Sequence, residues 1–128
     1  MSQKILIVDD VPASREAMAK VLRREGYQTA TARNGAEGLA RLKDGPVDLV
    51  LLDNMMPEVD GLTFLTGIRR FPKWKELPVI MLTGLKDRQT HMRAHTLGVR
   101  EYLIKTEFTM DELLGHIEKH IPKAMQPN

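Results

Sequence analysis

Acidic side chains follow two short, largely apolar segments, at positions that would support metal-assisted chemistry. The segment Ile5–Val8 ends in the adjacent acids Asp9 and Asp10, and the segment Val47–Leu52 ends in Asp53. Both segments resemble strands buried on both faces of a parallel sheet, so their carboxyl ends would meet at one edge. Three carboxylates repel one another unless a cation compensates them. The pattern therefore predicts an oxygen-ligand site for Mg²⁺, with one carboxylate left free to react.

Strand-like and helix-like segments alternate along the whole chain, which indicates five β-α units. The expected strands are Ile5–Val8, Tyr27–Ala32, Val47–Asp53, Leu77–Leu82 and Val99–Ile104. The expected helices are Pro12–Glu25, Ala36–Lys43, Leu62–Phe71, Asp87–Leu97 and Met110–His120. This order predicts an α/β fold, a right-handed, doubly wound, five-stranded parallel sheet with helices on both faces.

Ligands of such folds bind beyond the carboxyl ends of the strands, where the strand order reverses. Five polar residues fall at predicted carboxyl ends, those of the first, third, fourth and fifth strands. They are Asp9, Asp10, Asp53, Thr83 and Lys105. Their chemistry and common position favour a function over chance.

Length and composition set the limits of that function. The 128 residues, with 42% hydrophobic and 28% charged side chains, are typical of one globular domain, here residues 1–128 with a core from 4 to 122. Because 19 Lys and Arg nearly balance 17 Asp and Glu, neither nucleic acid nor a membrane is expected as a partner. The densest basic group, Arg69, Arg70, Lys73 and Lys75, is interpreted as a solvated helix end.

The absence of cysteine excludes disulfides and thiolate metal sites, and it fits a cytoplasmic protein. No apolar stretch approaches the roughly 20 residues of a membrane span. Met1–Gln3 leads directly into the first strand rather than into a signal peptide.

Several short motifs occur in one order along the chain, and together they are specific. They are Ile5-Leu6-Ile7-Val8-Asp9-Asp10, Asn34-Gly35, Leu51-Leu52-Asp53, Met56-Pro57, Asp60-Gly61, Leu82-Thr83-Gly84 and Tyr102-Leu103-Ile104-Lys105. In these motifs the chain resembles the receiver domain of the two-component response regulators, in its single-domain, CheY-like form. The resemblance covers essentially the whole chain and implies a flavodoxin-like sheet with strand order 2-1-3-4-5.

The resemblance also implies a set of roles at the phosphorylation site. Asp53 would be the nucleophile that accepts a phosphoryl group from a histidine of a sensor kinase or phosphotransfer protein. Asp10 and Asp53 would bind Mg²⁺ directly, the backbone carbonyl of Met55 would add a ligand, and Asp9 would act mainly through water. Lys105 and the metal would neutralise the transferring group, since phosphoryl transfer needs mostly positioning and charge compensation.

A second set of implied roles concerns the response to phosphorylation. Thr83 would bind a phosphoryl oxygen, and Thr83 and Tyr102 would form a switch pair. The hydroxyl would move toward the phosphoryl group while the aromatic ring turns inward. The surface of the fourth helix, fifth strand and fifth helix would then change and control a downstream protein. The domain would be a switch rather than an enzyme, and a monomer or weak homodimer.

Two departures from the family pattern lead to expectations of their own. Thr106 stands where the family usually has proline after the lysine, which favours a trans Lys105–Thr106 peptide. Met55 and Leu85 occupy the positions two residues after Asp53 and Thr83, which flank the path of the attacking water in receiver domains. Since neither side chain can orient a water, a long-lived phosphorylated state is predicted.

Other functions remain as alternatives. A nucleotide- or flavin-binding module would need glycines and backbone donors after the first strand, where this chain has acids. A phosphatase with an aspartyl-phosphate intermediate usually has a second acid where Met55 stands. A pseudo-receiver that only binds proteins would be expected to lack an acid or the lysine.

The histidines and the tryptophan are open to further readings. His91, His95, His116 and His120 form pairs spaced four apart on predicted helices. They show no acid obviously arranged with them, so zinc is not favoured. Trp74 covers the end of the third helix or anchors a partner, and the pattern does not decide between the two.

Overall fold

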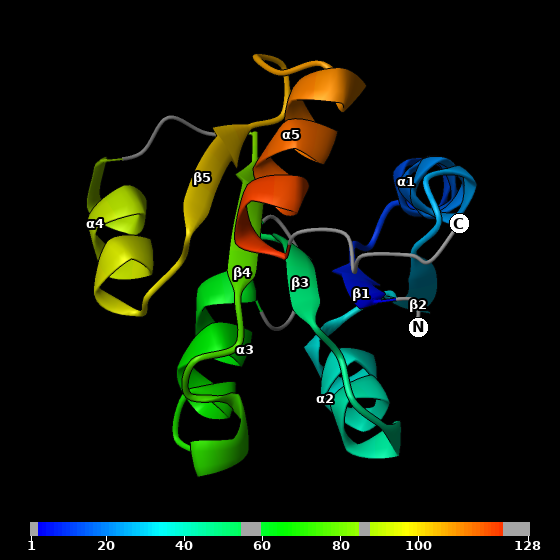
Figure 1. Cartoon of the computed structure of the whole chain (residues 1–128). Coiled ribbons are helices and arrows are strands. Elements are labelled where there is room, and N and C mark those ends of the chain that lie inside the picture. Colours follow the sequence, from blue (N-terminus) through cyan, green and yellow to red (C-terminus); the bar gives the residue numbers. More distant parts are fainter. Residues whose placement is uncertain (1–2, 55–59, 85–87, 122–128) are drawn as a thin grey trace.

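The computed structural model of the chain describes residues 3–54, 60–84 and 88–121. Its centre is one sheet of five parallel strands in the order β2-β1-β3-β4-β5 (Figure 1). The strands are β1 (Lys4–Val8), β2 (Gln28–Ala32), β3 (Leu49–Asp53), β4 (Val79–Thr83) and β5 (Glu101–Ile104). The helices are α1 (Pro12–Arg24), α2 (Gly35–Asp44), α3 (Gly61–Ile68), α4 (Arg88–Thr96) and α5 (Met110–His120). The doubly wound fold and the strand order are confirmed.

The two-residue repeat of the strands divides the core into two layers. Ile5 and Ile7 of β1 face α1 and α5, whereas Leu6 and Val8 face the layer that contains α2, α3 and α4. All of β3 and β4 is buried, which explains why these strands read as nearly continuous apolar runs. The strand order reverses between β1 and β3, so the ends of these two strands form the expected binding edge.

The helices begin where polar side chains can cap them. Asn34 accepts a hydrogen bond from the Glu37 amide at the start of α2, and Thr109 and Glu112 form a reciprocal capping box at the start of α5. In α1 Pro12 occupies the first turn, where its missing N–H costs nothing. These caps explain the agreement between predicted and observed helix starts.

The third helix ends earlier than predicted. The expectation was Leu62–Phe71, but α3 stops at Ile68 and a 3₁₀ turn, η1, follows at Pro72–Trp74. Pro72 cannot donate to a helical carbonyl, and the Arg69 guanidinium instead binds carbonyls beyond the helix. Trp74 is buried, with its ring edge-on to Phe71 at 5.2 Å between centroids. It therefore covers the end of α3 and is not an exposed anchor.

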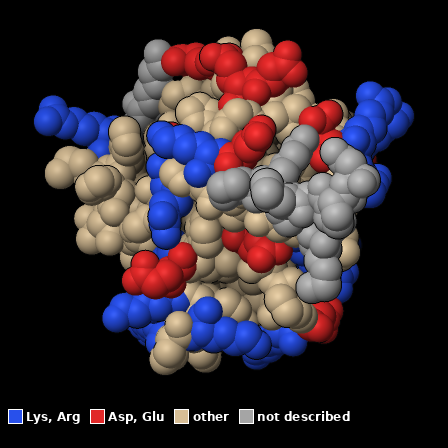
Figure 2. All heavy atoms as spheres, in the orientation of Figure 1, with Lys and Arg blue, Asp and Glu red and all other residues tan. Residues whose placement is uncertain are grey.

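The basic group after α3 is only partly a solvated helix end. Arg70, Lys73 and Lys75 are exposed, and Figure 2 shows Lys and Arg side chains along the end of the molecule where α3 finishes. Arg69 is different, because it turns inward and donates to the carbonyls of Leu97, Trp74 and Leu77 at 2.7–2.9 Å. Arg69 is thus a structural clamp between α3, η1 and the end of α4.

Candidate functional site

The three acids singled out by the sequence meet at the carboxyl ends of β1 and β3. Asp9, Asp10 and Asp53 each offer a carboxylate oxygen, and these oxygens lie within 4.8 Å of one another. Val8 pairs with Leu52 in the parallel register, so the residues that follow them are neighbours. Asp9 and Asp53 are buried and Asp10 is half-buried. Such a cluster is costly without a compensating cation.

Lys105 supplies part of that compensation. Its Nζ lies 3.0 Å from Asp53 Oδ2, and the lysine reaches this position from the loop after β5. Its backbone N–H donates to the Thr83 carbonyl at 2.7 Å, which fixes the start of the loop against the end of β4. No peptide bond among the described residues is cis, so Lys105–Thr106 is trans, as Thr106 led us to expect.

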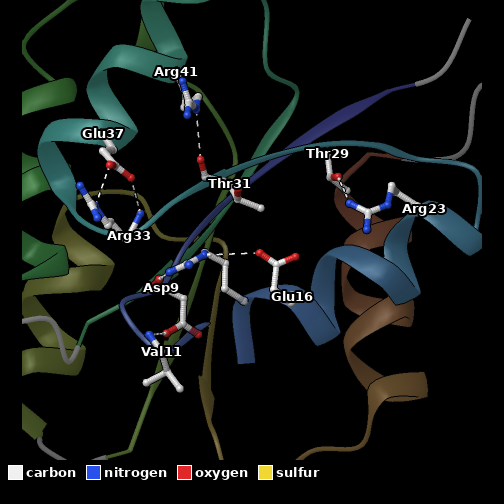
Figure 3. A network of polar contacts seen from close by, with 10 residues as sticks. Asp9, Val11, Glu16, Arg23, Thr29, Thr31, Arg33, Glu37 and Arg41 are labelled. Carbon is white, nitrogen blue, oxygen red and sulfur yellow. Dashed lines mark hydrogen bonds and ion pairs between the residues drawn. The ribbon is translucent and has the colours of Figure 1, made fainter. Parts of the chain in front are cut away.

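The remaining negative charge fits a divalent cation bound through oxygen. One carboxylate oxygen of Asp9 accepts from the Val11 amide at 2.9 Å, a contact visible in Figure 3. Its other oxygen, Oδ2, is buried and has no hydrogen-bond partner among the residues described. With Lys105 counted, the three acids leave a net charge of −2, the amount that Mg²⁺ would balance.

Arg15 is a residue of this site that sequence reasoning missed. Its guanidinium donates to the backbone carbonyl of Asp9 at 2.9 Å, from the first turns of α1. The contact ties the helix to the end of β1 and so orients the acidic pair. An arginine six residues after an acid is too common a spacing to signal this contact from the sequence.

The start of α3 packs tightly against the backbone of the phosphoacceptor candidate. A Cβ at Gly61 would lie 2.9 Å from both the Asp53 carbonyl oxygen and the Asn54 Cα. Asn54 Oδ1 also accepts from the Leu62 amide at 3.1 Å, at the start of α3. Only glycine fits at position 61 without displacing the strand end that carries Asp53.

The expected switch pair lies on one face of the sheet. Thr83 is fully buried at the end of β4, and Tyr102 pairs with Met81 in the register between β4 and β5. Met81 and Thr83 are two residues apart, so Tyr102 and Thr83 project to the same side, toward the layer of α4. Two further residues lie outside the described residues. They are Met55, whose backbone carbonyl was expected to bind the metal, and Leu85, which was expected to slow hydrolysis together with Met55.

The histidine pair on α5 has an acidic partner that the sequence did not reveal. Glu101 on β5 lies 3.5 Å from His116 Nδ1 and 2.7 Å from His120 Nε2. The Glu101 carboxylate therefore joins β5 to α5 through both histidines.

Comparison with known proteins agrees with the geometry. The family model that describes the response regulator receiver domain matches residues 5–118, and the chain belongs to this family. The probable chemotaxis protein CheY of Rhizobium etli is 36% identical over 116 residues, which are 90% of this chain and 89% of that protein. The DNA-binding regulator RpaA of Synechocystis is 35% identical over 114 residues, 89% of this chain but only 47% of the regulator. The chain thus spans about half of that relative.

Solved structures give the same result. The response regulator TrrA from Thermotoga maritima, in complex with Mg(2+)-BeF, matches with a TM-score of 0.80 and 37% identity over 91% of this chain and 97% of that one. Receiver domains are signalling switches of two-component systems, generally without enzymatic activity, and they bind Mg²⁺ at an acidic site. They interact with histidine kinases and downstream effectors. Within the described part of the chain, no helix is long and apolar enough to span a membrane.

Proposed function

We propose that this receiver domain is a phosphorylation-controlled switch in which Asp53 accepts a phosphoryl group from a phosphohistidine. The kinase or phosphotransfer protein would donate the group. The observation that supports this most is the position of Asp53, whose buried carboxylate lies 3.0 Å from Lys105 Nζ beside two further acids. A carboxylate oxygen of Asp53 attacks phosphorus, the P–N bond to the imidazole breaks, and the imidazole leaves with its electron pair and is protonated.

Asp10 and Asp53 are the residues that would hold Mg²⁺ directly, with Asp9 acting through water and the carbonyl of Met55 as a further ligand. The ion would supply charge compensation for the phosphoryl oxygens. The buried Oδ2 of Asp9 and the net charge of the cluster support this assignment. Lys105 would bind one phosphoryl oxygen from the β5 side, and the Thr83 hydroxyl would bind another.

The output of the switch follows from the position of Thr83 and Tyr102 on one face of adjacent strands. Movement of the Thr83 hydroxyl toward the phosphoryl group makes room for the Tyr102 ring, and α4, β5 and α5 change their common surface. A downstream protein reads that surface. A pseudo-receiver is a weaker candidate, because such a domain has no need for two acids and a lysine that converge on the Asp53 carboxylate.

Intact mass after incubation with Mg²⁺ and acetyl phosphate tests the proposal. The wild-type chain should gain one phosphoryl group, and Asp53→Ala should gain none. Asp44→Ala is the matched control, since Asp44 is an exposed acid at the end of α2, which leads into the start of β3 and not to the carboxyl ends that carry the site. Equal phosphorylation of wild type and Asp53→Ala would contradict the assignment of the phosphoacceptor.

A further inference from the structure

His91 of α4 lies flat against Tyr102 of β5. The ring centroids are 4.5 Å apart and the ring planes differ by 6°. His91 is exposed, Tyr102 is half-buried, and the hydroxyl oxygen of Tyr102 is buried. The imidazole therefore covers one face of a phenol ring whose polar end points into the protein.

Beside this stack the surface is hollowed. A cavity of about 230 Å³ lies between α4 and β5, and His91 and Tyr102 both line it. Its other lining residues are Ala94, His95, Val99, Arg100 and Glu101. The hollow offers space into which the Tyr102 ring can turn, and the ring cannot leave its present orientation without separating from His91.

We propose that His91 is a positioning residue that latches Tyr102 in the orientation with its hydroxyl buried. The inference rests on the proposed role of Thr83 and Tyr102 as the switch pair, and it adds a residue that sets the balance between the two orientations. A stacked aromatic pair favours the orientation in which the rings touch by about two- to tenfold in population. That is enough to tune a two-state switch without abolishing it.

Fluorine NMR of protein labelled with 3-fluorotyrosine tests the latch directly. The chain has two tyrosines, and the buried Tyr27 serves as an internal reference for Tyr102. In the absence of phosphate, His91→Ala should shift and broaden the Tyr102 signal, whereas His91→Phe, which keeps a stacked ring, should restore it. Arg93→Ala is the control from the same helix, because Arg93 is exposed and is not among the residues that line this cavity, and it should leave the signal near its wild-type position.

A ligand titration distinguishes a latch from ordinary packing. Titration with Mg²⁺ and beryllofluoride should need about two- to tenfold less beryllofluoride to move Tyr102 in His91→Ala, because the ring no longer has to separate from His91. If His91→Ala leaves the signal unchanged, or Arg93→Ala has an equal effect, the latch is wrong. If beryllofluoride does not change the Tyr102 signal of the wild type, the proposed role of Tyr102 in the switch is wrong. The phosphate-free spectra still test the stack with His91 in that case.

Discussion

His120 Nε2 on α5 lies 2.7 Å from Glu101 Oε2 on β5, and this contact joins two elements of the proposed output surface. His116 and Lys119 approach the same carboxylate at 3.5 Å. Burial raises the pKa of Glu101, but the His120 hydrogen bond and the attraction of His116, Lys119 and His120 outweigh burial and hold it below its ordinary value.

The pKa of Glu101 is lower in the folded state than in the unfolded state. Its ion pairs therefore stabilise the fold at pH values above the pKa of the unfolded state, and this stabilisation is lost as the pH falls through the pKa of the folded state. Glu101→Gln should reduce the free energy of unfolding at pH 6 by less than about 1 kcal/mol, since the group is partly exposed. Urea unfolding from pH 6 to 3 should show this difference vanish in acid. Glu118→Gln, at an exposed site on α5, should show no such trend; a difference that persists at pH 3 would contradict the assignment.

Mg²⁺ should stabilise the wild-type fold, because binding relieves repulsion among the three acids. With a dissociation constant in the micromolar-to-millimolar range, a tenfold excess over that constant adds about 1.4 kcal/mol to the free energy of unfolding. Asp10→Asn should be more stable than wild type without Mg²⁺ and should gain less from it. Denaturant melts with and without Mg²⁺ measure both effects. A clearly destabilised Asp10→Asn in metal-free buffer would count against mutual repulsion in the cluster.

Arg69→Met should lower the free energy of unfolding by about 2–4 kcal/mol, because the carbonyls of Trp74, Leu77 and Leu97 lose a charged donor. Arg69→Lys should recover only part of this, since an ammonium cannot span the carbonyls as the planar fork does. Arg70→Met, at the exposed neighbouring position, is the control and should cost little. Equal stabilities of the two methionine variants would show that the clamp contributes nothing.

Thr83→Ala should leave phosphorylation of Asp53 largely intact but weaken the conformational response, because the hydroxyl couples the site to the α4 surface. Amide chemical shifts with and without beryllofluoride measure that response. Thr83→Ser retains the hydroxyl and should respond nearly as the wild type does. An unchanged response in Thr83→Ala would remove Thr83 from the switch.

The phosphorylated state should decay over many minutes or hours, because Met55 and Leu85 cannot orient an attacking water. The double variant Met55→Asn with Leu85→Glu should lose its phosphoryl group faster. The decay of phospho-Asp53 followed by intact mass compares the two. Loss at the wild-type rate would mean that these side chains do not control the lifetime.

The strands and the acidic site were predictable because their signals are local. Apolar runs of strand length define β1, β3 and β4, and parallel strands must bring Asp9, Asp10 and Asp53 to one edge whatever the details of packing. The start of α5 was equally clear, since Thr109 and Glu112 cap it within four residues.

Contacts between distant segments were not predictable in this way. Arg69 binds the carbonyl of Leu97, 28 residues away, and Glu101 finds His120 only because α5 folds back along β5. Nothing in the local pattern distinguishes the half-buried Arg69 from the exposed Arg70. The Tyr102–His91 stack has the same character, because it depends on how α4 rotates against the sheet.

The Arg69 clamp also gives α4 the mechanics of a lever. The guanidinium holds the carbonyls of Leu97 and Gly98, just beyond the last residue of the helix, so that end serves as a fulcrum. The nine residues of α4 make an arm of about 13 Å. A tilt of α4 by roughly 10° about this fulcrum would move the end of the helix at Arg88 by about 2 Å, while the end beside Arg69 would stay nearly still. Any reader of α4 would therefore sense the largest excursion near Arg88 and the smallest near Thr96.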